Sequence, residues 1–293
     1  MKKIILDCDC TFGIPGCDVD DGLALLYLLG DPEAELVGVT TTYGNNVLEK
    51  VYPNTKKFLK DIGREDIPVY KGGSNPEDIH NDASQFLAEM AEKHSGDLEL
   101  LVTGSVTNIY GAYIINPKFF EQVNRIVMMG GVTEPLIFAK KEMSELNFSC
   151  DPQASFTVLT KGNDVSVITG NNCLKVLFTK EEYEKELSDE KNPVVQFIKK
   201  ETDYWFEYNM DEYGIPGYYN WDAIAAAYML HPELFDTENI SFHLSLEDLQ
   251  AGKLTRDEKE KNAILKIPVI KNADTFCKNI YDTWKNVKFC SER

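Results

Sequence analysis

The sequence predicts an α/β fold, a single domain over residues 1–293 with a mainly parallel open sheet and helices on both faces. Short segments rich in β-branched and long apolar residues alternate with segments of helical periodicity. This alternation is typical of right-handed strand–helix–strand crossovers, which bury a parallel sheet between helices. The chain contains no internal repeat, low-complexity tract or long Gly/Ser/Pro-rich linker, which favours one domain.

The expected elements follow this rhythm in chain order. Strands are predicted at Lys3–Asp7, Glu35–Thr41, Val69–Tyr70, Leu98–Thr103, Arg125–Met129 and Val165–Thr169. Helices are predicted between them at Asp20–Leu29, Val47–Ile62, Ala83–Lys93, Val106–Ile114 and Pro152–Leu159. The second half has expected helices at Lys180–Met210, Trp221–Leu230 and Ala273–Val287 and strands near Ile240–Leu244 and Ala263–Ile270. In such a sheet, ligands lie beyond the carboxyl ends of the strands.

Composition excludes several classes of partner. The 30 Lys and Arg residues stand against 48 Asp and Glu residues, giving a formal charge of −18. A polyphosphate or an anionic membrane surface would be repelled, so we expect neither nucleic acid nor membrane partners. The seven cysteines are odd in number and scattered, which predicts free thiols in a reducing cytoplasm. A zinc site made from Cys8, Cys10 and Cys17 is a lesser alternative, because no His lies nearby.

Carboxylates gather at the end of the first expected strand. Asp7 ends that strand and Asp9 follows it, while Asp18 precedes the first helix and Asp20 and Asp21 open it. Asp20 and Asp21 alone could be ordinary acidic residues at a helix start, but this does not explain Asp7 and Asp9. So many carboxylates would repel one another unless a cation neutralised them. The pattern therefore predicts a hard divalent cation held by oxygen ligands.

A phosphatase is the first alternative. Asp7-Cys8-Asp9-Cys10-Thr11 after a strand is similar to the opening motif of haloacid-dehalogenase-like magnesium phosphatases, and Leu101–Ser105 resembles their second motif. Those enzymes need a later strand that ends in an acidic pair for magnesium. Here that strand ends in Met128-Met129-Gly130-Gly131, which offers no carboxylate.

A fuller resemblance extends over roughly residues 1 to 285. Its motifs are Asp7-Cys8-Asp9 with Asp20-Asp21-Gly22, Thr40-Thr41-Thr42-Tyr43-Gly44-Asn45, Ile79-His80-Asn81-Asp82, Thr103-Gly104-Ser105-Val106-Thr107-Asn108, Met128-Met129-Gly130-Gly131, Ser144-Glu145-Leu146-Asn147 with Asp151-Pro152-Gln153-Ala154, and Trp221-Asp222-Ala223. In this order and spacing they resemble the nucleoside hydrolase family of the inosine–uridine preferring type. The resemblance implies a Rossmann-like core and a homo-oligomer, a dimer or a tetramer.

The resemblance also implies an activity and a site. Members hydrolyse the N-glycosidic bond of ribonucleosides with a bound Ca²⁺ that orients the ribose and the attacking water. The implied metal ligands in this sequence are Asp9, Asp21, the Thr103 carbonyl and Asp222, and Asp9 is also the implied general base. The implied ribose partners are Asp20, Asn45 and Asn147, with Glu145 near the 5′-hydroxyl. A non-catalytic ribose-binding or metal-binding homologue is the alternative outside enzymes.

The residue expected beside the departing base differs from that of the inosine–uridine type. That type carries His before the late metal Asp, whereas this sequence has Trp221, as in the purine-preferring branch. An indole ring there would stack on a purine base, although Trp at a helix start is also common in cores. His80 is a second candidate for the acid that protonates the base, although a loop His is often simply solvated.

Two loops also differ from the pattern of the family. Ten residues separate Asp9 from Asp20, where the family has three, so Cys10–Val19 contains an insertion with Gly13 and Gly16. The site is intact only if this loop returns Asp21 to the metal. The segment Val132–Ser144 is also unfamiliar, and its Lys140 and Lys141 offer partners for an anionic substituent.

Overall fold

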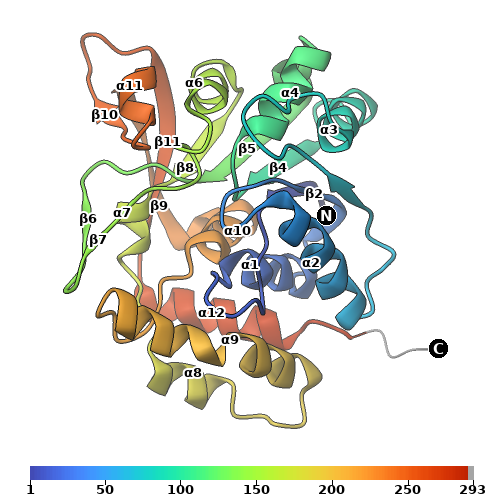
Figure 1. The fold of residues 1–293 in the computed structure, drawn as a ribbon, viewed down its shortest axis with the longest axis vertical. Coiled ribbons are helices and arrows are strands. Elements are labelled where there is room, and N and C mark those ends of the chain that lie inside the picture. The colour runs from blue at the N-terminus through green and yellow to red at the C-terminus, as the bar shows by residue number, and fades with distance from the viewer. Residues whose placement is uncertain (290–293) are drawn as a thin grey trace.

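The structure, a computed structural model, describes residues 1–289 (Figure 1). Its strands are β1 (Lys2–Cys8), β2 (Ala34–Thr41), β3 (Val69–Lys71), β4 (Leu98–Val102), β5 (Val123–Met129), β6 (Leu136–Ile137), β7 (Glu142–Met143), β8 (Val165–Ile168), β9 (Phe235–His243), β10 (Thr255–Arg256) and β11 (Ala263–Ile270). Its helices are α1 (Asp20–Gly30), α2 (Leu48–Asp61), α3 (Asp82–Lys93), α4 (Thr107–Ile115), α5 (Phe119–Gln122), α6 (Pro152–Lys161), α7 (Gly170–Cys173), α8 (Lys180–Glu186), α9 (Pro193–Glu212), α10 (Trp221–Leu230), the 3₁₀ turn η1 (Pro232–Leu234), α11 (Leu246–Leu249) and α12 (Ala273–Lys285).

The main sheet has nine strands in the order β10-β9-β11-β8-β5-β4-β1-β2-β3. The strands from β3 to β11 in this order are parallel, and β9 and β10 join antiparallel at one edge. The chain runs from β1 outward to β2 and β3, then returns to place β4 on the other side of β1. The strand order therefore reverses between β1 and β4, which is where open α/β sheets bind ligands.

Helices cover both faces of this sheet, as predicted. In β1, Ile4 and Leu6 belong to the apolar cluster formed with α1, α10 and α12, whereas Ile5 belongs to the cluster formed with α3, α4 and α6. Figure 1 shows these two groups of helices on opposite sides of the strands. The alternation follows from strand geometry, in which successive side chains point to opposite faces. The α/β architecture is confirmed; the single domain over residues 1–293 stays a prediction.

The Cys10–Val19 insertion packs against α2 and α9. The Phe12 ring lies 5.2 Å from the Phe58 ring and 5.5 Å from the Phe197 ring, measured between centroids. It also covers Gly22 in α1, where an added Cβ would lie 2.3 Å from the Phe12 ring. A buried aromatic anchor of this kind fixes the loop by apolar burial.

Polar contacts bring the insertion back toward its start. The Tyr204 hydroxyl of α9 donates to the carbonyl oxygens of Ile14 (2.9 Å) and Cys17 (2.8 Å). Gly13 and Gly16 both have φ of +78°, a backbone conformation that side chains disfavour, so the two glycines permit the turns. The excursion therefore returns the chain to the start of α1 beside β1.

Two sequence-based boundaries are wrong, and one hairpin was not predicted. The helix predicted over Lys180–Met210 is two helices, α8 and α9, because Asn192 accepts a hydrogen bond from Val194 N and Pro193 opens the second helix. The strand near Ile240–Leu244 begins five residues earlier, at Phe235. The unfamiliar segment 132–144 forms the β6–β7 hairpin, which the sequence analysis did not predict.

Within residues 1–289, none of the helices combines the length and hydropathy of a membrane span.

His231 joins the far ends of α1 and α10. Its Nε2 lies 2.6 Å from Asp31 Oδ2 at the end of α1, and its Nδ1 lies 3.0 Å from Glu233 Oε1. Burial lowers the pKa of His231, but hydrogen bonds with Asp31 and Glu233 outweigh burial and raise the pKa above its usual value. Protonation of the imidazole therefore adds to the stability of the folded state, and this added stability is lost when the ring becomes neutral.

We predict a pH-dependent effect of His231→Gln. Since the folded-state pKa is raised, the stabilisation is fully present below the unfolded pKa of about 6.5 and is lost as pH rises through the folded value. The difference in free energy of unfolding between wild type and variant should be largest near pH 5.5 and shrink toward pH 8.5. Urea denaturation across this range measures it, and a difference that grows with pH would contradict the assignment.

Candidate active site

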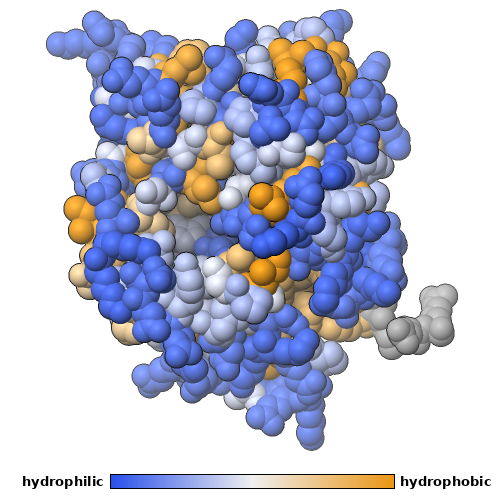
Figure 2. Space-filling view, viewed as in Figure 1, coloured by the Kyte–Doolittle hydropathy of each residue, from blue (hydrophilic) through white to orange (hydrophobic). Residues whose placement is uncertain are grey.

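A cavity of about 270 Å³ opens at the carboxyl ends of the strands, where the strand order reverses. Its walls come from the insertion, the start of α1, the β2–α2 loop, the ends of β4 and β5, the β6–β7 hairpin, the 144–147 loop, the C-terminal half of α9 and the start of α10. Figure 2 shows the corresponding hollow near the centre of this face. Distant parts of the sequence therefore meet at one place.

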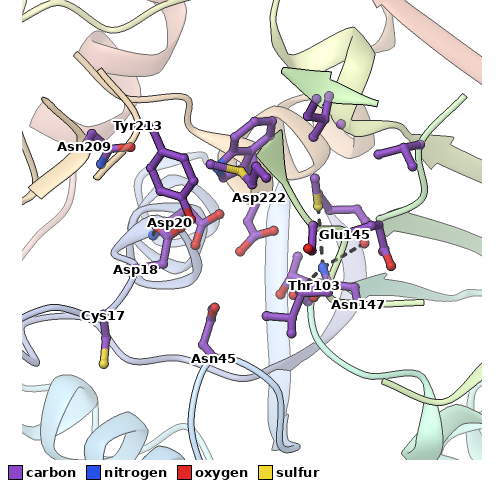
Figure 3. A pocket seen from close by; sticks show the side chains of 18 of the residues that line it. Cys17, Asp18, Asp20, Asn45, Thr103, Glu145, Asn147, Asn209, Tyr213 and Asp222 are labelled. Atoms are coloured by element: carbon purple, nitrogen blue, oxygen red, sulfur yellow. Dashed lines mark hydrogen bonds between the residues drawn. The ribbon is translucent and has the colours of Figure 1, made fainter. Parts of the chain in front are cut away.

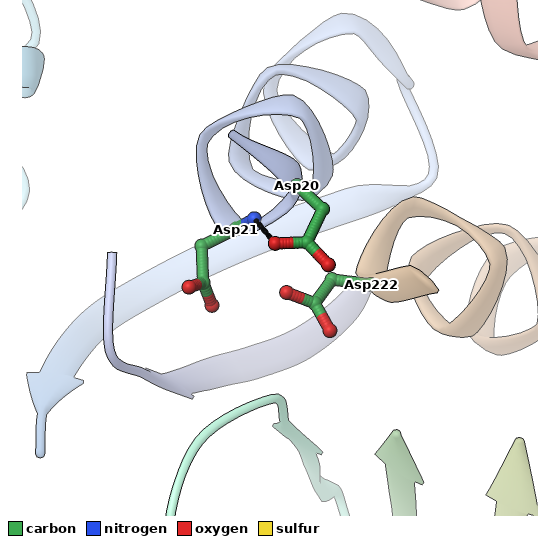
Figure 4. A group of neighbouring side chains, drawn as sticks. All are labelled: Asp20, Asp21 and Asp222. Carbon is green, nitrogen blue, oxygen red and sulfur yellow. Dashed lines mark hydrogen bonds between the residues drawn. The ribbon is translucent and has the colours of Figure 1, made fainter. Parts of the chain in front are cut away.

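Three buried carboxylates face one another in this region (Figure 4). Asp20 and Asp21 occupy the first turn of α1, and Asp222 occupies the first turn of α10. One carboxylate oxygen of each lies within 4.8 Å of the others, a spacing that allows a shared metal ion. The N-termini of two helices favour negative charge here, because their free N–H groups and dipoles point at the carboxylates.

Asp9 follows β1 and lies next to this group. The Asn45 backbone N–H donates to Asp9 Oδ2 at 2.5 Å, and Asn45 Nδ2 donates to Asp9 Oδ1 at 3.2 Å. An added Cβ on Gly44 would lie 2.0 Å from Asp9 Oδ2, so only glycine lets this backbone approach the carboxylate. The β2–α2 loop therefore fixes the orientation of Asp9.

Burial shifts the acidity of the whole group. Burial raises the pKa of Asp9 and of Asp20 to about 7, and the charge of neighbouring carboxylates adds to the rise. The pKa values of Asp18, Asp21 and Asp222 are raised further by the same two causes. Asp21 Oδ2 is buried and has no hydrogen-bond partner among the described residues. Such an oxygen set suits a hard divalent cation, which would offset both burial and repulsion.

Thr103 and Asn147 lie across the cavity from Asp18 and Asp20 (Figure 3). The Thr103 hydroxyl donates to Asp21 Oδ1 at 2.7 Å. Asn147 Nδ2 donates to the carbonyl oxygens of Thr103 and Met129, both at 3.0 Å. The amide of Asn147 thus positions the Thr103 carbonyl, which is the predicted metal ligand.

Glu145 lines the cavity and also holds the loop that carries Asn147. Its Oε1 accepts from the N–H groups of Gly131 (3.0 Å) and Phe148 (2.8 Å), and its Oε2 accepts from Ser149 N (2.9 Å). Three backbone donors satisfy this buried carboxylate, which explains how it is tolerated there.

Aromatic side chains form the opposite wall. Trp221 lines the cavity beside Asp222, with its ring 5.3 Å from the Tyr219 ring. Three further aromatic residues line the cavity and were not predicted from the sequence: Trp205 and Tyr208 of α9, and Tyr213, which follows the last residue of α9. The signal that could have found the first two is their i, i+3 spacing, which places them on one face of a helix.

Other predicted site residues lie elsewhere. His80 is in an exposed loop between β3 and α3 and does not line the cavity. Lys140 and Lys141 also lie outside its lining, because their ammonium groups contact α9, at the Asp211 carbonyl (2.7 Å) and at Glu212 (2.6 Å). The zinc alternative finds no support in the described residues, since the group of possible metal ligands there contains only aspartates.

Comparison with known proteins identifies the family. The family described as "Inosine-uridine preferring nucleoside hydrolase" matches residues 4–290. The chain belongs to this family. As a nucleoside hydrolase it is an N-ribosylhydrolase, an enzyme that cleaves the N-glycosidic bond of ribonucleosides. The alternative of a magnesium phosphatase is not supported by this match.

Relatives of this nucleoside hydrolase have different base preferences. "Probable uridine nucleosidase 2" of Arabidopsis thaliana is 29% identical over 82% of this chain and 81% of its own length. The "Inosine-uridine preferring nucleoside hydrolase" of Crithidia fasciculata is 28% identical over 87% of this chain and 85% of its own. The solved structure of the "Purine-Preferring Ribonucleoside Hydrolase from Gardnerella vaginalis" has a TM-score of 0.83 and 26% identity, covering 98% and 99% of the two chains.

We predict that Asp222→Asn removes cation-dependent stabilisation. Wild type should gain on the order of 5 °C in Tm when Ca²⁺ is raised to about 100 times its Kd, because the cation binds only the folded carboxylate group. The variant should lose this gain, although without cation it melts no lower, since one repelling charge is gone. Thermal melts with Ca²⁺ and with EDTA measure both effects. Glu247→Gln, at an exposed position, is the control; an unchanged Ca²⁺ response in Asp222→Asn would remove that residue from the site.

Proposed function

We propose that this enzyme is a Ca²⁺-dependent hydrolase that favours purine ribonucleosides and releases ribose and the free base. The observation that carries the proposal is a cavity lined by Asp20, Asp222 and aromatic side chains, with Asp9 and Asp21 buried beside it. A ribose has hydroxyl groups for the polar side, and a purine has a flat face for the aromatic side.

The proposed metal ligands are Asp9, Asp21, the Thr103 carbonyl and Asp222. Bound there, Ca²⁺ would orient the ribose hydroxyls and lower the pKa of an attacking water. Asp20 joins Asp21 and Asp222 in the observed group, so it is both a proposed ribose partner and a close neighbour of the cation. Calcium is favoured over softer metals because the donors are all oxygen.

Asp9 is the proposed general base. Its carboxylate accepts a proton from the attacking water while Asn45 holds both of its oxygens. Asn45 and Asn147 are further proposed ribose partners, and Glu145 is the proposed partner of the 5′-hydroxyl. Asn147 is already oriented by the Thr103 and Met129 carbonyls, which reduces the entropy lost on binding.

Trp221 is the proposed contact for the departing base. Its place beside Asp222 and in the cavity wall supports stacking on a purine. His80 remains a proposed acid only if its loop moves, because it lies outside the cavity lining in this structure.

Several properties of the whole protein belong to the same proposal. The six described cysteines are free thiols, which is consistent with the cytoplasm. The acidic net charge supports a protein that binds no nucleic acid. A homo-oligomer, dimer or tetramer, is proposed from the family resemblance.

The direct test is a reducing-sugar assay over inosine, guanosine, adenosine, uridine and cytidine, with calcium content measured on the same sample. Ribose release with bound calcium and faster turnover of purines is the expected result. Binding of all five without ribose release would instead support a non-catalytic homologue.

We predict a large loss of turnover in Asp9→Asn. The substitution keeps the size of the side chain but removes the proton acceptor, and loss of a general base costs about 10²- to 10⁴-fold. Steady-state kcat should fall by this range, while nucleoside binding measured by calorimetry survives. Near-normal kcat would exclude Asp9 as the base.

We predict that Trp221→Ala harms purines more than pyrimidines. A purine has the larger face for stacking, so kcat/KM for inosine should fall about 100-fold and that for uridine less. Trp221→Phe, which keeps a ring, is the matched control and should retain most purine activity. Equal losses on both substrates together with a lower Tm would show that Trp221 supports the fold instead.

A further inference from the structure

One part of the cavity wall consists of aliphatic side chains that a plain nucleoside leaves without a partner. They are Met129, Val132, Leu136, Met143 and Leu146. In the proposed function the carboxylates serve the ribose hydroxyls and the aromatic rings serve the base. Aliphatic side chains gain free energy when an apolar group of a ligand removes them from water, and ribose offers no such group. The aliphatic wall therefore indicates an apolar substituent on the ligand.

The aliphatic wall lies next to Glu145. An added Cβ on Gly170 would lie 2.9 Å from Leu136 Cδ1 and 3.4 Å from Val132 Cγ1, so these two side chains are neighbours. The same point lies 3.7 Å from the Gly131 carbonyl oxygen, and the Gly131 N–H donates to Glu145 Oε1 at 3.0 Å. Because Glu145 is the proposed partner of the 5′-hydroxyl, the aliphatic wall borders the 5′ end of the ribose.

The β6–β7 hairpin contributes an inward-facing pair to this wall. Leu136 of β6 pairs directly with Met143 of β7, and both residues line the cavity. The next pair, Ile137 with Glu142, points to the other face because side chains alternate along a strand. Leu136 is 4% exposed, whereas Ile137 is 74% exposed and does not line the cavity. The two faces of the hairpin therefore differ in their access to a ligand.

Contacts at both ends of the hairpin hold it in place. At its tip, Lys140 Nζ donates to the Asp211 carbonyl oxygen at 2.7 Å. At its base, Thr133 N donates to Asn171 Oδ1 at 2.7 Å. The inward-facing pair is therefore a fixed part of the cavity wall, and a ligand meets it without rearranging the hairpin.

Glu145 has little capacity left for a 5′-hydroxyl. A carboxylate has about four lone-pair positions. Oε1 already accepts from Gly131 N (3.0 Å) and Phe148 N (2.8 Å), and Oε2 accepts from Ser149 N (2.9 Å). The Gly252 backbone lies against Oε2, since an added Cβ there would be 2.0 Å from this oxygen. A 5′-hydroxyl can therefore receive at most one hydrogen-bond acceptor from Glu145, and a substrate without this hydroxyl loses little.

We propose that this end of the cavity binds an apolar substituent at C5′, so that 5′-alkylthio-5′-deoxyribonucleosides are a substrate class of the enzyme. The inference rests on the proposed function and names a substrate class for the same site. An alkylthio group is apolar and polarizable, which suits contact with the Met143 thioether and the Leu136 methyl groups. These two side chains are specificity-determining residues, distinct from the metal ligands and the general base.

The C5′ group takes no part in the bonds formed and broken at C1′. Water adds to C1′ and the bond from C1′ to the base nitrogen breaks, as for any ribonucleoside in the proposed function. The products are then the free base and a 5-alkylthio ribose, whose C1 is a reducing centre like that of ribose. The reducing-sugar assay therefore detects both substrate classes.

The test compares 5′-methylthioinosine with inosine, which have the same base and the same bond to be broken. Wild-type kcat/KM should be about tenfold higher for 5′-methylthioinosine, the order expected for an added small apolar group in an apolar pocket. A value equal to or below that of inosine would overturn the inference while leaving the proposed function intact.

Met143→Gln keeps the length of the side chain and replaces its apolar end by an amide. The ratio of kcat/KM for 5′-methylthioinosine to that for inosine should fall about tenfold in this variant. Met143→Leu should keep most of the ratio because it stays apolar. Using a ratio cancels any general effect of the substitution on the enzyme. If Met143→Gln does not fold, Leu146→Gln takes its place, since Leu146 lines the cavity but is 38% exposed.

Ile137→Gln is the matched control, because it introduces the same amide on the outer face of the same hairpin. Its ratio should equal that of wild type. A ratio that is unchanged in the variant of the cavity wall, or that falls equally in Ile137→Gln, would overturn the inference.

Calorimetric binding of both nucleosides separates the two proposals. Absence of sugar release from both would contradict the proposed function. The inference would then be decided by affinity: tighter binding of 5′-methylthioinosine than inosine by wild type, lost in Met143→Gln and kept in Ile137→Gln, supports it. Equal or weaker binding of 5′-methylthioinosine by wild type overturns it.

Discussion

The carboxylates of Asp20 and Asp21 at the start of α1 face Asp222 at the start of α10, and all three are removed from water. Buried like charges are tolerated only with a compensating cation, proton or dipole. The surrounding structure must therefore supply this compensation and hold the three carboxylates in place. The two helices must converge at their N-termini, and both are almost entirely buried along their length. At their far ends, His231 and Asp31 join them again. The packing of α1 against α10 is therefore also the frame of the active site.

The end of β1 separates the two carboxylates of its terminal motif, because Asp7 lies within the strand and Asp9 lies beyond it. Asp7 points to the face covered by α4, where Thr40 Oγ1 (2.5 Å) and Asn108 Nδ2 (2.8 Å) donate to its Oδ1. Asp9 lies two residues further along, where the strand has ended and alternation no longer sets the direction of the side chain, and it is buried beside the cavity carboxylates instead. Asn108 Oδ1 in turn accepts from Gly73 N, so Asp7 is connected to the β3–α3 loop. Two residues of one short motif thus have separate tasks, one in the interior and one in the site.

Much of the fold and part of the site could be predicted from the sequence, for physical reasons. Hydrophobic periodicity finds buried helices such as α1 and α10, and parallel topology places Asp9 and Thr103 at one edge. Contacts between distant segments leave no such signal, because the helical spacing of Trp205 and Tyr208 indicates a shared face without indicating what that face contacts. The cavity-lining face of α9 and the contacts of Lys140 and Lys141 with the end of that helix could therefore not be predicted. The break at Asn192 was signalled locally by a capping residue before Pro193 but was outweighed by the helical pattern on both sides.

The packing of Phe12 ties the insertion to the helices around it. The Phe12 ring fits only because Gly22 has no side chain, and it packs between the Phe58 and Phe197 rings. The Tyr204 hydroxyl fixes the next turn of the loop by a hydrogen bond. The loop therefore cannot be transplanted alone into a relative whose helices lack these features. A transfer of the insertion that keeps its shape would have to carry Gly22, the two Phe rings and Tyr204 with it.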